Sequence, residues 1–258
     1  MKFFLFFLLA PSFLTFSQVD SIVSNDVKQF FCTASSFYTS PLRFDNEDWI
    51  KFSSVIGITA LSSMVDKDIQ ELSQRNKNNF TKNLFNIDKY YYIEFVGGSV
   101  VALYGYGLLD NNSQIRKLAV KLTEATILAS SITLITKIMV GRGRPYKQNS
   151  QYYTNPFSFD NDYNSLPSGH ATLTFAYSTV MANEVDNIFW KVGWYSLAGL
   201  VSCARIYHNQ HWFSDVFLGS AIGYFTGEFV SNYNLGQSEE VGLNLFPIPN
   251  GLAFQLRF

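Results

Sequence analysis

Six apolar stretches of helical length divide the chain, and they limit what it can fold into. They lie near residues 50–66, 90–109, 117–140, 170–185, 188–206 and 212–231. Apolar stretches of this length between polar connections are typical of helices rather than strands. We therefore expect an all-α fold, a helical bundle of about six core helices with a site at one end. A chain of 258 residues has room for one such domain with small extensions.

The charged residues within these stretches decide between a core helix and a membrane span. The uncharged runs cover residues 52–65, 95–109, 125–136, 171–183, 192–204 and 216–227. Each is shorter than the roughly eighteen residues that mark a span, so core helices are favoured. Charged side chains near helix ends can snorkel to the membrane surface, so spans stay open as an alternative.

Both ends of the chain carry their own patterns. Residues 1–17 have the pattern of a signal peptide: Lys2, then the apolar run 3–10, then a small residue near position 17. This predicts export to the cell envelope and the periplasm; the alternative is an integral inner-membrane protein whose site faces the periplasm. Apolar residues alternate along the tail on either side of Pro249-Asn250-Gly251, which predicts a β-hairpin within residues 236–258. A lead-in, residues 18–48, and a main domain, residues 49–235, lie between these ends.

The amino-acid composition limits which classes of partner the sequence predicts. The net charge is −1 with 15% charged residues and no basic stripe, which excludes nucleic acid as the expected partner. Aromatic residues reach 17%, which favours a nearby membrane surface. Cys32 and Cys203 are able to pair in an oxidising compartment, but two buried free thiols are the simpler expectation. The oligomeric state is left open.

Three short segments carry the residues that bear chemistry, and the first supplies cations. Lys137 ends the stretch 117–140, and Arg144 and Pro145 follow it. A phosphoryl group in transfer spreads negative charge over its oxygens, which Arg144 can meet with a planar fork and Lys137 with a point charge. A basic cluster that closes an apolar helix would look the same, so this segment does not decide alone. The linker 146–166 then leads to the second segment, and we expect it to lie over the pocket, with its Tyr and Phe side chains as candidates for substrate contact.

The second segment, Pro167-Ser168-Gly169-His170, comes directly before the stretch 170–185. Ser168 is a good N-cap, and Gly169 lets the backbone approach a ligand closely. The free N–H groups of a helix N-terminus bind anions, and a histidine in the first turn can protonate a leaving oxygen. An ordinary capped helix with a surface histidine fits this segment equally well.

The third segment runs from Arg205 to Asp215. His211 and Asp215 lie four residues apart, so a helix would bring the carboxylate within reach of the imidazole. A carboxylate that accepts from one ring nitrogen fixes the tautomer and leaves the other nitrogen free to attack phosphorus. Arg205 would hold the phosphate during this attack. His208 has no such partner, because Trp212 stands four residues on. A helix-capping pair is the alternative for His211 and Asp215.

Taken together, the three segments resemble the signatures of the type 2 phosphatidic acid phosphatase (PAP2) and vanadium haloperoxidase-like superfamily, in a bacterial exported form. The family pattern is Lys-x6-Arg-Pro, Pro-Ser-Gly-His and Ser-Arg-x5-His-x3-Asp, and the resemblance covers roughly residues 92–231. This sequence departs from the family pattern at Ala204, where the family usually has Ser. The resemblance implies the following roles: His211 as nucleophile, Asp215 as its orienting carboxylate, His170 as general acid, and Lys137, Arg144, Ser168, Gly169 and Arg205 as phosphate ligands. It implies no metal and no cofactor.

The function expected from this resemblance is hydrolysis of phosphate monoesters or pyrophosphates through a phosphohistidine intermediate. The expected substrate is a phosphorylated lipid or isoprenoid. A non-specific soluble periplasmic acid phosphatase acting on small phosphomonoesters is the first alternative. A vanadate-dependent haloperoxidase is the second, although the chain is shorter than such enzymes usually are.

Overall fold

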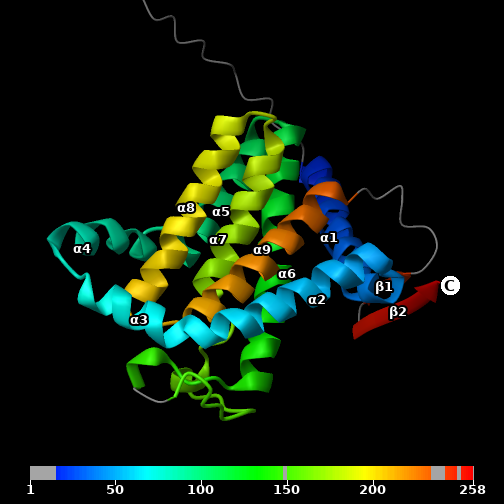
Figure 1. The fold of residues 1–258 in the computed structure, drawn as a ribbon. Coiled ribbons are helices and arrows are strands. Elements are labelled where there is room, and N and C mark those ends of the chain that lie inside the picture. The colour runs from blue at the N-terminus through cyan, green and yellow to red at the C-terminus, as the bar shows by residue number, and fades with distance from the viewer. Residues whose placement is uncertain (1–15, 148–149, 234–241, 249–250, 258) are drawn as a thin grey trace, which may run out of the picture.

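The computed structural model describes residues 16–147, 150–233, 242–248 and 251–257 (Figure 1). The expected all-α architecture is confirmed, because most of the described residues are helical. The helices are α1 Phe16–Thr39, α2 Asn46–Ser62, α3 Asp66–Arg75, α4 Asn79–Phe85, α5 Ile93–Leu109, α6 Ser113–Val140, α7 Gly169–Glu184, α8 Ile188–Tyr207 and α9 Phe213–Asn232. Two strands, β1 Gly242–Ile248 and β2 Gly251–Arg257, follow.

Helix α7 is the centre of the bundle. It packs against α6, α8 and α9, and ten of its sixteen residues are buried. The main core includes Leu122 and Leu128 from α6, Val180 from α7, Val201 from α8 and Val230 from α9. Residues that are far apart in the sequence therefore share one apolar interior, which holds the ends of these four helices in fixed positions.

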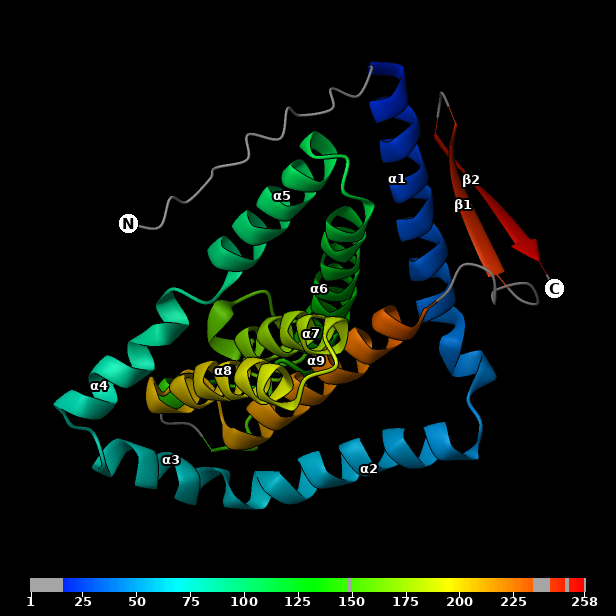
Figure 2. The same cartoon turned by 90° about the horizontal axis from the view of Figure 1, so that it is seen from above.

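Three further helices surround this bundle, as Figure 2 shows from above. Helix α5 packs along α6, and α2 along α9, while α1 contacts α6 and β1. Helices α3 and α4 continue from α2 and contact α8. The short 3-10 helix Asn86–Lys89, which also contacts α8, leads from α4 towards α5.

The six predicted helices correspond to α2, α5, α6, α7, α8 and α9, with boundaries that differ by up to four residues. The lead-in 18–48 is more ordered than expected, because α1 occupies most of it. Asp26 of α1 pairs with Arg116 at 3.1 Å and accepts a hydrogen bond from Tyr104 at 2.8 Å, so polar contacts anchor this helix. The Asn-rich connection that follows α2 forms α3 and α4.

The two ends of the chain are described only in part. Most of the expected signal peptide, residues 1–17, lies outside the described residues, and α1 begins at Phe16. In the tail, β1 and β2 pair antiparallel. Gly242 lies opposite Arg257 at one end of the pair, and Ile248 lies opposite Gly251 at the other. Residues 249–250 of the expected turn lie outside the described residues.

The two cysteines are unpaired. Cys32 lies on α1 and is partly exposed, whereas Cys203 lies on α8 and is exposed. The expectation of two buried thiols is therefore wrong. Cys203 faces away from the core because Ser202 and Ala204, its neighbours on α8, take the buried positions.

Among the described residues, α6 is the one single helix whose length and hydropathy would allow it to cross a membrane. Half of its most apolar window is buried within the protein. The segments Asn79–Lys89 and Ile93–Leu109 pass the same test as a pair, with a bend of 46° between them.

Close contact between α7 and α9 depends on a glycine of α9. A Cβ atom at Gly223 would lie 2.3 Å from the Thr172 carbonyl oxygen and 2.8 Å from the Ala176 nitrogen. Any side chain there would push the two helices apart, since both atoms belong to the backbone of α7.

We predict that Gly223→Ala lowers the free energy of unfolding by about 1–3 kcal/mol, the usual cost of overpacking. Thermal unfolding of the variant and the wild type measures this loss of stability. The matched control is Gly193→Ala on α8, where a Cβ meets nothing within 4 Å. Alanine is a better helix former than glycine by about 0.5–1 kcal/mol, so this control should unfold at the same or a higher temperature. A Gly223→Ala protein as stable as the wild type would contradict the close contact.

Candidate active site

Four helix ends converge at the lower end of the bundle in Figure 1. They are the C-terminal ends of α6 and α8 and the N-terminal ends of α7 and α9. Backbone hydrogen bonds tie them together: the Ser168 N–H donates to the Asp215 carbonyl oxygen at 2.9 Å. The His211 N–H donates to the Arg205 carbonyl oxygen at 3.3 Å. The three sequence segments therefore meet in space.

A glycine sets the direction of the chain after α6. Gly141 has φ of 58°, and its N–H donates to the Lys137 carbonyl oxygen at 2.8 Å. This left-handed residue ends the helix in the way that glycine favours. A Cβ atom at Gly141 would lie 1.8 Å from the Asn155 carbonyl oxygen, so only glycine fits. The turn carries Arg142 and Arg144 back towards α7 and α9.

His211 is buried, and its ring orientation is fixed by Ser165. The Nδ1 atom lies 2.7 Å from the Ser165 carbonyl oxygen. Because a carbonyl oxygen only accepts, Nδ1 carries the proton and Nε2 carries the lone pair. Burial, together with the charges of Lys137 and Arg144, lowers the pKa of His211 to about 3 against the opposing effect of Asp215. The imidazole is therefore neutral.

The expected hydrogen bond from His211 to Asp215 is not formed, because Nδ1 lies 3.8 Å from Asp215 Oδ2. The Asp215 carboxylate is turned towards other donors: the Trp212 N–H at 2.9 Å, the Ser165 hydroxyl at 2.5 Å and Arg142 Nη1 at 2.6 Å. Ser165 thus links the two residues, since its carbonyl holds His211 and its hydroxyl holds Asp215. Burial raises the pKa of Asp215, but His211, Arg142 and Ser165 outweigh it and hold that pKa below its usual value.

The two arginines of the first segment have different surroundings. Arg142 donates all five of its N–H groups, to Gln151, Ser214, Asp215 and Asp66. Arg144 donates three, to the backbone and side chain of Asn161 and to Gln210 at 2.9 Å each. Within the part of the chain described, two N–H groups of Arg144 are left for a ligand, which suits the phosphate role that the sequence assigns to it.

The N-terminus of α7 carries an unused hydroxyl. Ser168 takes the N-cap position as expected, but its side chain makes no capping hydrogen bond. Its Oγ is buried and has no partner among the described residues. Gly169 follows as the first residue of α7. A buried donor at a helix N-terminus is a suitable ligand for an oxyanion.

His170 stacks on Tyr92, with the ring centroids 3.5 Å apart and the planes inclined by 6°. Burial lowers the pKa of His170 to about 2, and the charges of Arg205, Arg144 and Lys137 add to the shift. Tyr92, just before α5, was not found by sequence reasoning, because three consecutive tyrosines at 90–92 give no sign of which one faces the site.

Arg205 pairs with a carboxylate from outside the three segments. Its Nη1 donates to Asp88 Oδ2 at 2.7 Å, while its buried Nε has no partner among the described residues. His208 was expected to lack a partner, but its Nε2 lies 3.1 Å from the Phe85 carbonyl oxygen and 3.5 Å from Asp88 Oδ1. Residue spacing could not predict these contacts, because Phe85 and Asp88 are more than a hundred residues away from His208 in the sequence.

The linker 146–166 builds the site through polar groups rather than aromatic ones. Asn164 accepts a hydrogen bond from Lys137 through its carbonyl oxygen. Asn161 and Ser165 hold Arg144 and His211, as described above. Five aromatic side chains of the linker are exposed, and their contact with substrate stays a prediction: Tyr146, Tyr152, Tyr153, Phe157 and Phe159.

Comparison with known proteins gives a family match over the part of the chain that carries the site. The sequence model of the PAP2 superfamily matches residues 118–237, which include all eight predicted site residues. Residues 118–237 of the chain therefore resemble the PAP2 superfamily. Among the described residues, no group of three His, Cys, Asp or Glu side chains is placed to hold a metal ion.

Several known proteins are similar to the chain over longer ranges. The lipid A 1-phosphatase of Porphyromonas gingivalis is 23% identical over 209 residues, which is 80% of this chain and 42% of the relative. The undecaprenyl-diphosphatase of Sulfolobus acidocaldarius is 28% identical over 155 residues, 56% of this chain and 73% of the relative. The crystal structure of Aquifex aeolicus LpxE is 18% identical with a TM-score of 0.47, and the match covers 66% of this chain and 96% of that one.

We predict that inorganic phosphate stabilises the protein against thermal unfolding. At ten times the dissociation constant, binding should add about 1.4 kcal/mol. Arg144→Gln should remove most of the stabilisation, because Arg144 faces the site with unused donors. Lys147→Gln is the matched control, since Lys147 pairs with Asp162 at the surface. Equal stabilisation of both variants by phosphate would contradict the assignment of Arg144.

Proposed function

We propose that the protein is a PAP2-type phosphatase that hydrolyses lipid or isoprenoid phosphates or pyrophosphates through a phosphohistidine at His211. The observation that carries the proposal is the hydrogen bond from His211 Nδ1 to the Ser165 carbonyl oxygen. It leaves the Nε2 lone pair as the nucleophile, with Lys137 and Arg144 close enough to act on the ring electrostatically. The catalytic domain is the one expected from sequence, residues 49–235.

The first step transfers the phosphoryl group. His211 Nε2 attacks phosphorus, the bond from phosphorus to the leaving oxygen breaks, and His170 gives that oxygen a proton. Lys137, Arg144, Arg205 and the Ser168 hydroxyl stabilise the charge on the non-bridging oxygens. In the second step water attacks phosphorus, His170 takes up a proton from the water, and the bond from phosphorus to Nε2 breaks to release phosphate.

The low pKa of His170 constrains how its proton arrives. Burial and the charges of Arg205, Arg144 and Lys137 keep the ring neutral. A phosphate ester brings negative charge among those cations, and this charge raises the pKa of His170 when the substrate binds. The proton for the leaving group therefore enters together with the substrate.

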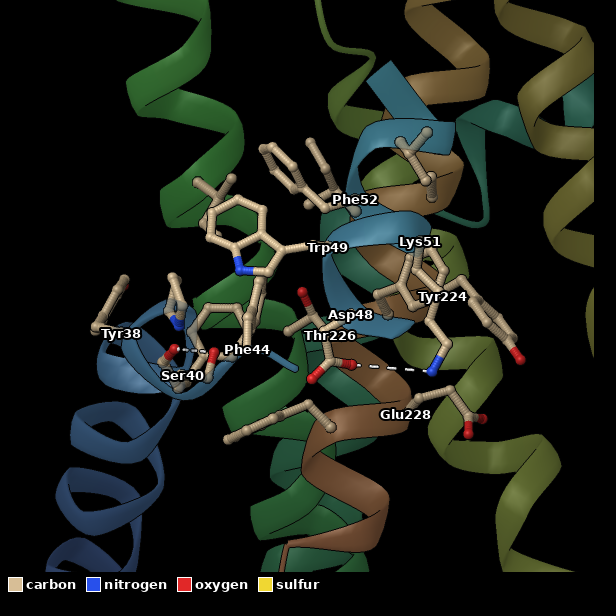
Figure 3. A pocket seen from close by; sticks show the side chains of 18 of the residues that line it. Tyr38, Ser40, Phe44, Asp48, Trp49, Lys51, Phe52, Tyr224, Thr226 and Glu228 are labelled. Carbon is tan, nitrogen blue, oxygen red and sulfur yellow. Dashed lines mark hydrogen bonds and ion pairs between the residues drawn. The ribbon is translucent and has the colours of Figure 1, made fainter. Parts of the chain in front are cut away.

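An apolar groove supports the choice of a lipid substrate. A cavity of about 1390 Å³ lies between the C-terminal end of α1, α2, α6 and α9. Figure 3 shows Phe44, Trp49, Phe52 and Tyr224 around it, with Asp48, Lys51 and Glu228 as charged groups. It includes Thr136, next to Lys137, and Leu218, one helical turn after Asp215. From Leu218 to Asn232 the groove follows α9 for about 21 Å, which is long enough for a hydrocarbon chain.

The names of two relatives, a lipid A 1-phosphatase and an undecaprenyl-diphosphatase, point to the same substrate class. Export to the periplasm, or an inner-membrane location with the site facing the periplasm, follows from the N-terminal pattern and belongs to this proposal. In either location the groove would receive the hydrocarbon part of the substrate at a membrane surface.

The two histidines should respond differently to the leaving group. His211→Ala should lose turnover on every substrate, because it removes the attack itself. His170→Ala should lose about 10²–10⁴-fold on an alkyl phosphate, the usual contribution of a general acid, and less on p-nitrophenyl phosphate. The pre-steady-state burst of released product measures the rate of the first step, the transfer of the phosphoryl group to the enzyme. Equal losses in both variants on both substrates would show that the roles are wrong.

The groove is tested by comparing a lipid phosphate in detergent micelles with p-nitrophenyl phosphate. Phe52→Asp should lower kcat/KM for the lipid by about 10- to 100-fold, equivalent to losing about 1.5–3 kcal/mol of apolar contact. It should leave p-nitrophenyl phosphate within about twofold, because Phe52 lies away from the reacting groups. Phe189→Asp, at an exposed position of α8 outside the groove, is the matched control. A parallel loss on both substrates in Phe52→Asp would argue against a lipid groove.

A further inference from the structure

Asp66 is a carboxylate that the function described above does not use. It is the first residue of α3 and lies outside residues 118–237, which the PAP2 model matches. Its exposed fraction is 0%. Removing a charge completely from water is costly unless hydrogen bonds and an opposite charge compensate it, so its partners define its role.

Every partner of Asp66 donates a hydrogen bond. Oδ1 accepts from the Ser214 N–H at 2.8 Å, and Oδ2 accepts from Arg142 Nη2 at 2.7 Å. The Ser214 hydroxyl accepts from Arg142 Nη1 at 2.7 Å, so its own proton points to Asp66 Oδ2 at 2.6 Å. A carboxyl group surrounded only by donors is ionised. Burial raises the pKa of Asp66, and the hydrogen bonds from Ser214 and Arg142 oppose that shift.

Asp66 and Asp215 therefore share one cation. Arg142 donates Nη2 to Asp66 at 2.7 Å and Nη1 to Asp215 at 2.6 Å, and both carboxylates are completely buried. Two negative charges against one positive charge leave this group with a surplus of one negative charge. His211 lies beside this group, with Nδ1 3.8 Å from Asp215 Oδ2.

His211 gains positive charge in the first step. Its Nδ1 keeps its proton, so a bond from Nε2 to phosphorus makes the ring cationic. The surplus negative charge lies on the Nδ1 side of the ring and stabilises that cation. Without Asp66, the full positive charge of Arg142 would act on Asp215 alone. It would then cancel the negative charge that stabilises the cationic ring.

We propose that Asp66 is a positioning residue for the nucleophile: through Arg142 it holds the Asp215 carboxylate beside His211 and supplies the charge that stabilises the phosphohistidine. This inference rests on the proposed function, since it assigns Asp66 a part in the same reaction. It extends the site to α3, a helix outside the three sequence segments.

The test is the rate of phosphoenzyme formation with p-nitrophenyl phosphate, measured by rapid quench, beside the inhibition constant of inorganic phosphate. Asp66→Asn should slow the burst by about 10- to 100-fold, the range typical when a residue that orients a reacting group is lost. The inhibition constant of phosphate should change by less than about threefold, because Lys137, Arg144 and Ser168 stay in place. Asp68→Asn, in the same turn of α3 but exposed, is the matched control and should behave as the wild type.

A double-mutant cycle shows whether Asp66 acts through Arg142. Asp66→Asn should slow the burst little further in an Arg142→Gln protein, because the connection is already broken. Equal effects in both backgrounds, or a normal burst in Asp66→Asn, would overturn the proposal. If Asp66→Asn does not fold, Ser214→Ala decides: a slower burst with unchanged phosphate inhibition supports the proposal, and a normal burst overturns it. A wild-type protein that forms no phosphoenzyme would instead refute the proposed function.

Discussion

The ion pairs of Arg142 with two buried carboxylates are the interaction on which the site depends. Arg142 donates every N–H group that it has, and it reaches α3, the linker before α7 and the start of α9 at once. Breaking such a buried pair by removing one partner typically costs about 3–5 kcal/mol. The positions of Asp215, Ser165 and His211 are therefore set by one guanidinium group that contacts none of the reacting atoms.

This arrangement divides the work between two arginines that stand two residues apart. Gly141 turns the chain, Arg142 goes to the interior, and Arg144 keeps two donors for phosphate. The four helix ends bring the remaining ligands, and the close packing of α7 on α9 holds Ser168 against Asp215. The proposed phosphate site at one end of the bundle and the apolar groove along α9 together match the proposed substrate, which has a charged head and a hydrocarbon chain.

Much of this could be predicted from the sequence, because its strongest signals are local. Six apolar stretches predicted α2 and α5–α9, and the three segments placed their residues at the ends of those helices. The direct bond between His211 and Asp215 was predicted wrongly, since spacing does not show that Asp215 turns to cap Trp212 at 2.9 Å. Asp66, Asp88 and Tyr92 escaped detection because their partners lie far away in the chain. For Asp66, the only signal was a carboxylate at the edge of an apolar stretch, with Asp68 two residues on.

The most direct test of the account is the position of phosphate on the trapped phosphoenzyme. Acid-labile phosphate from a quenched reaction should map to His211 by mass spectrometry, and phosphorus NMR of the denatured protein should assign it to Nε2. That isomer is expected because Nδ1 donates to the Ser165 carbonyl oxygen and is closed to attack. Phosphate on Nδ1, or on a residue other than His211, would contradict the account.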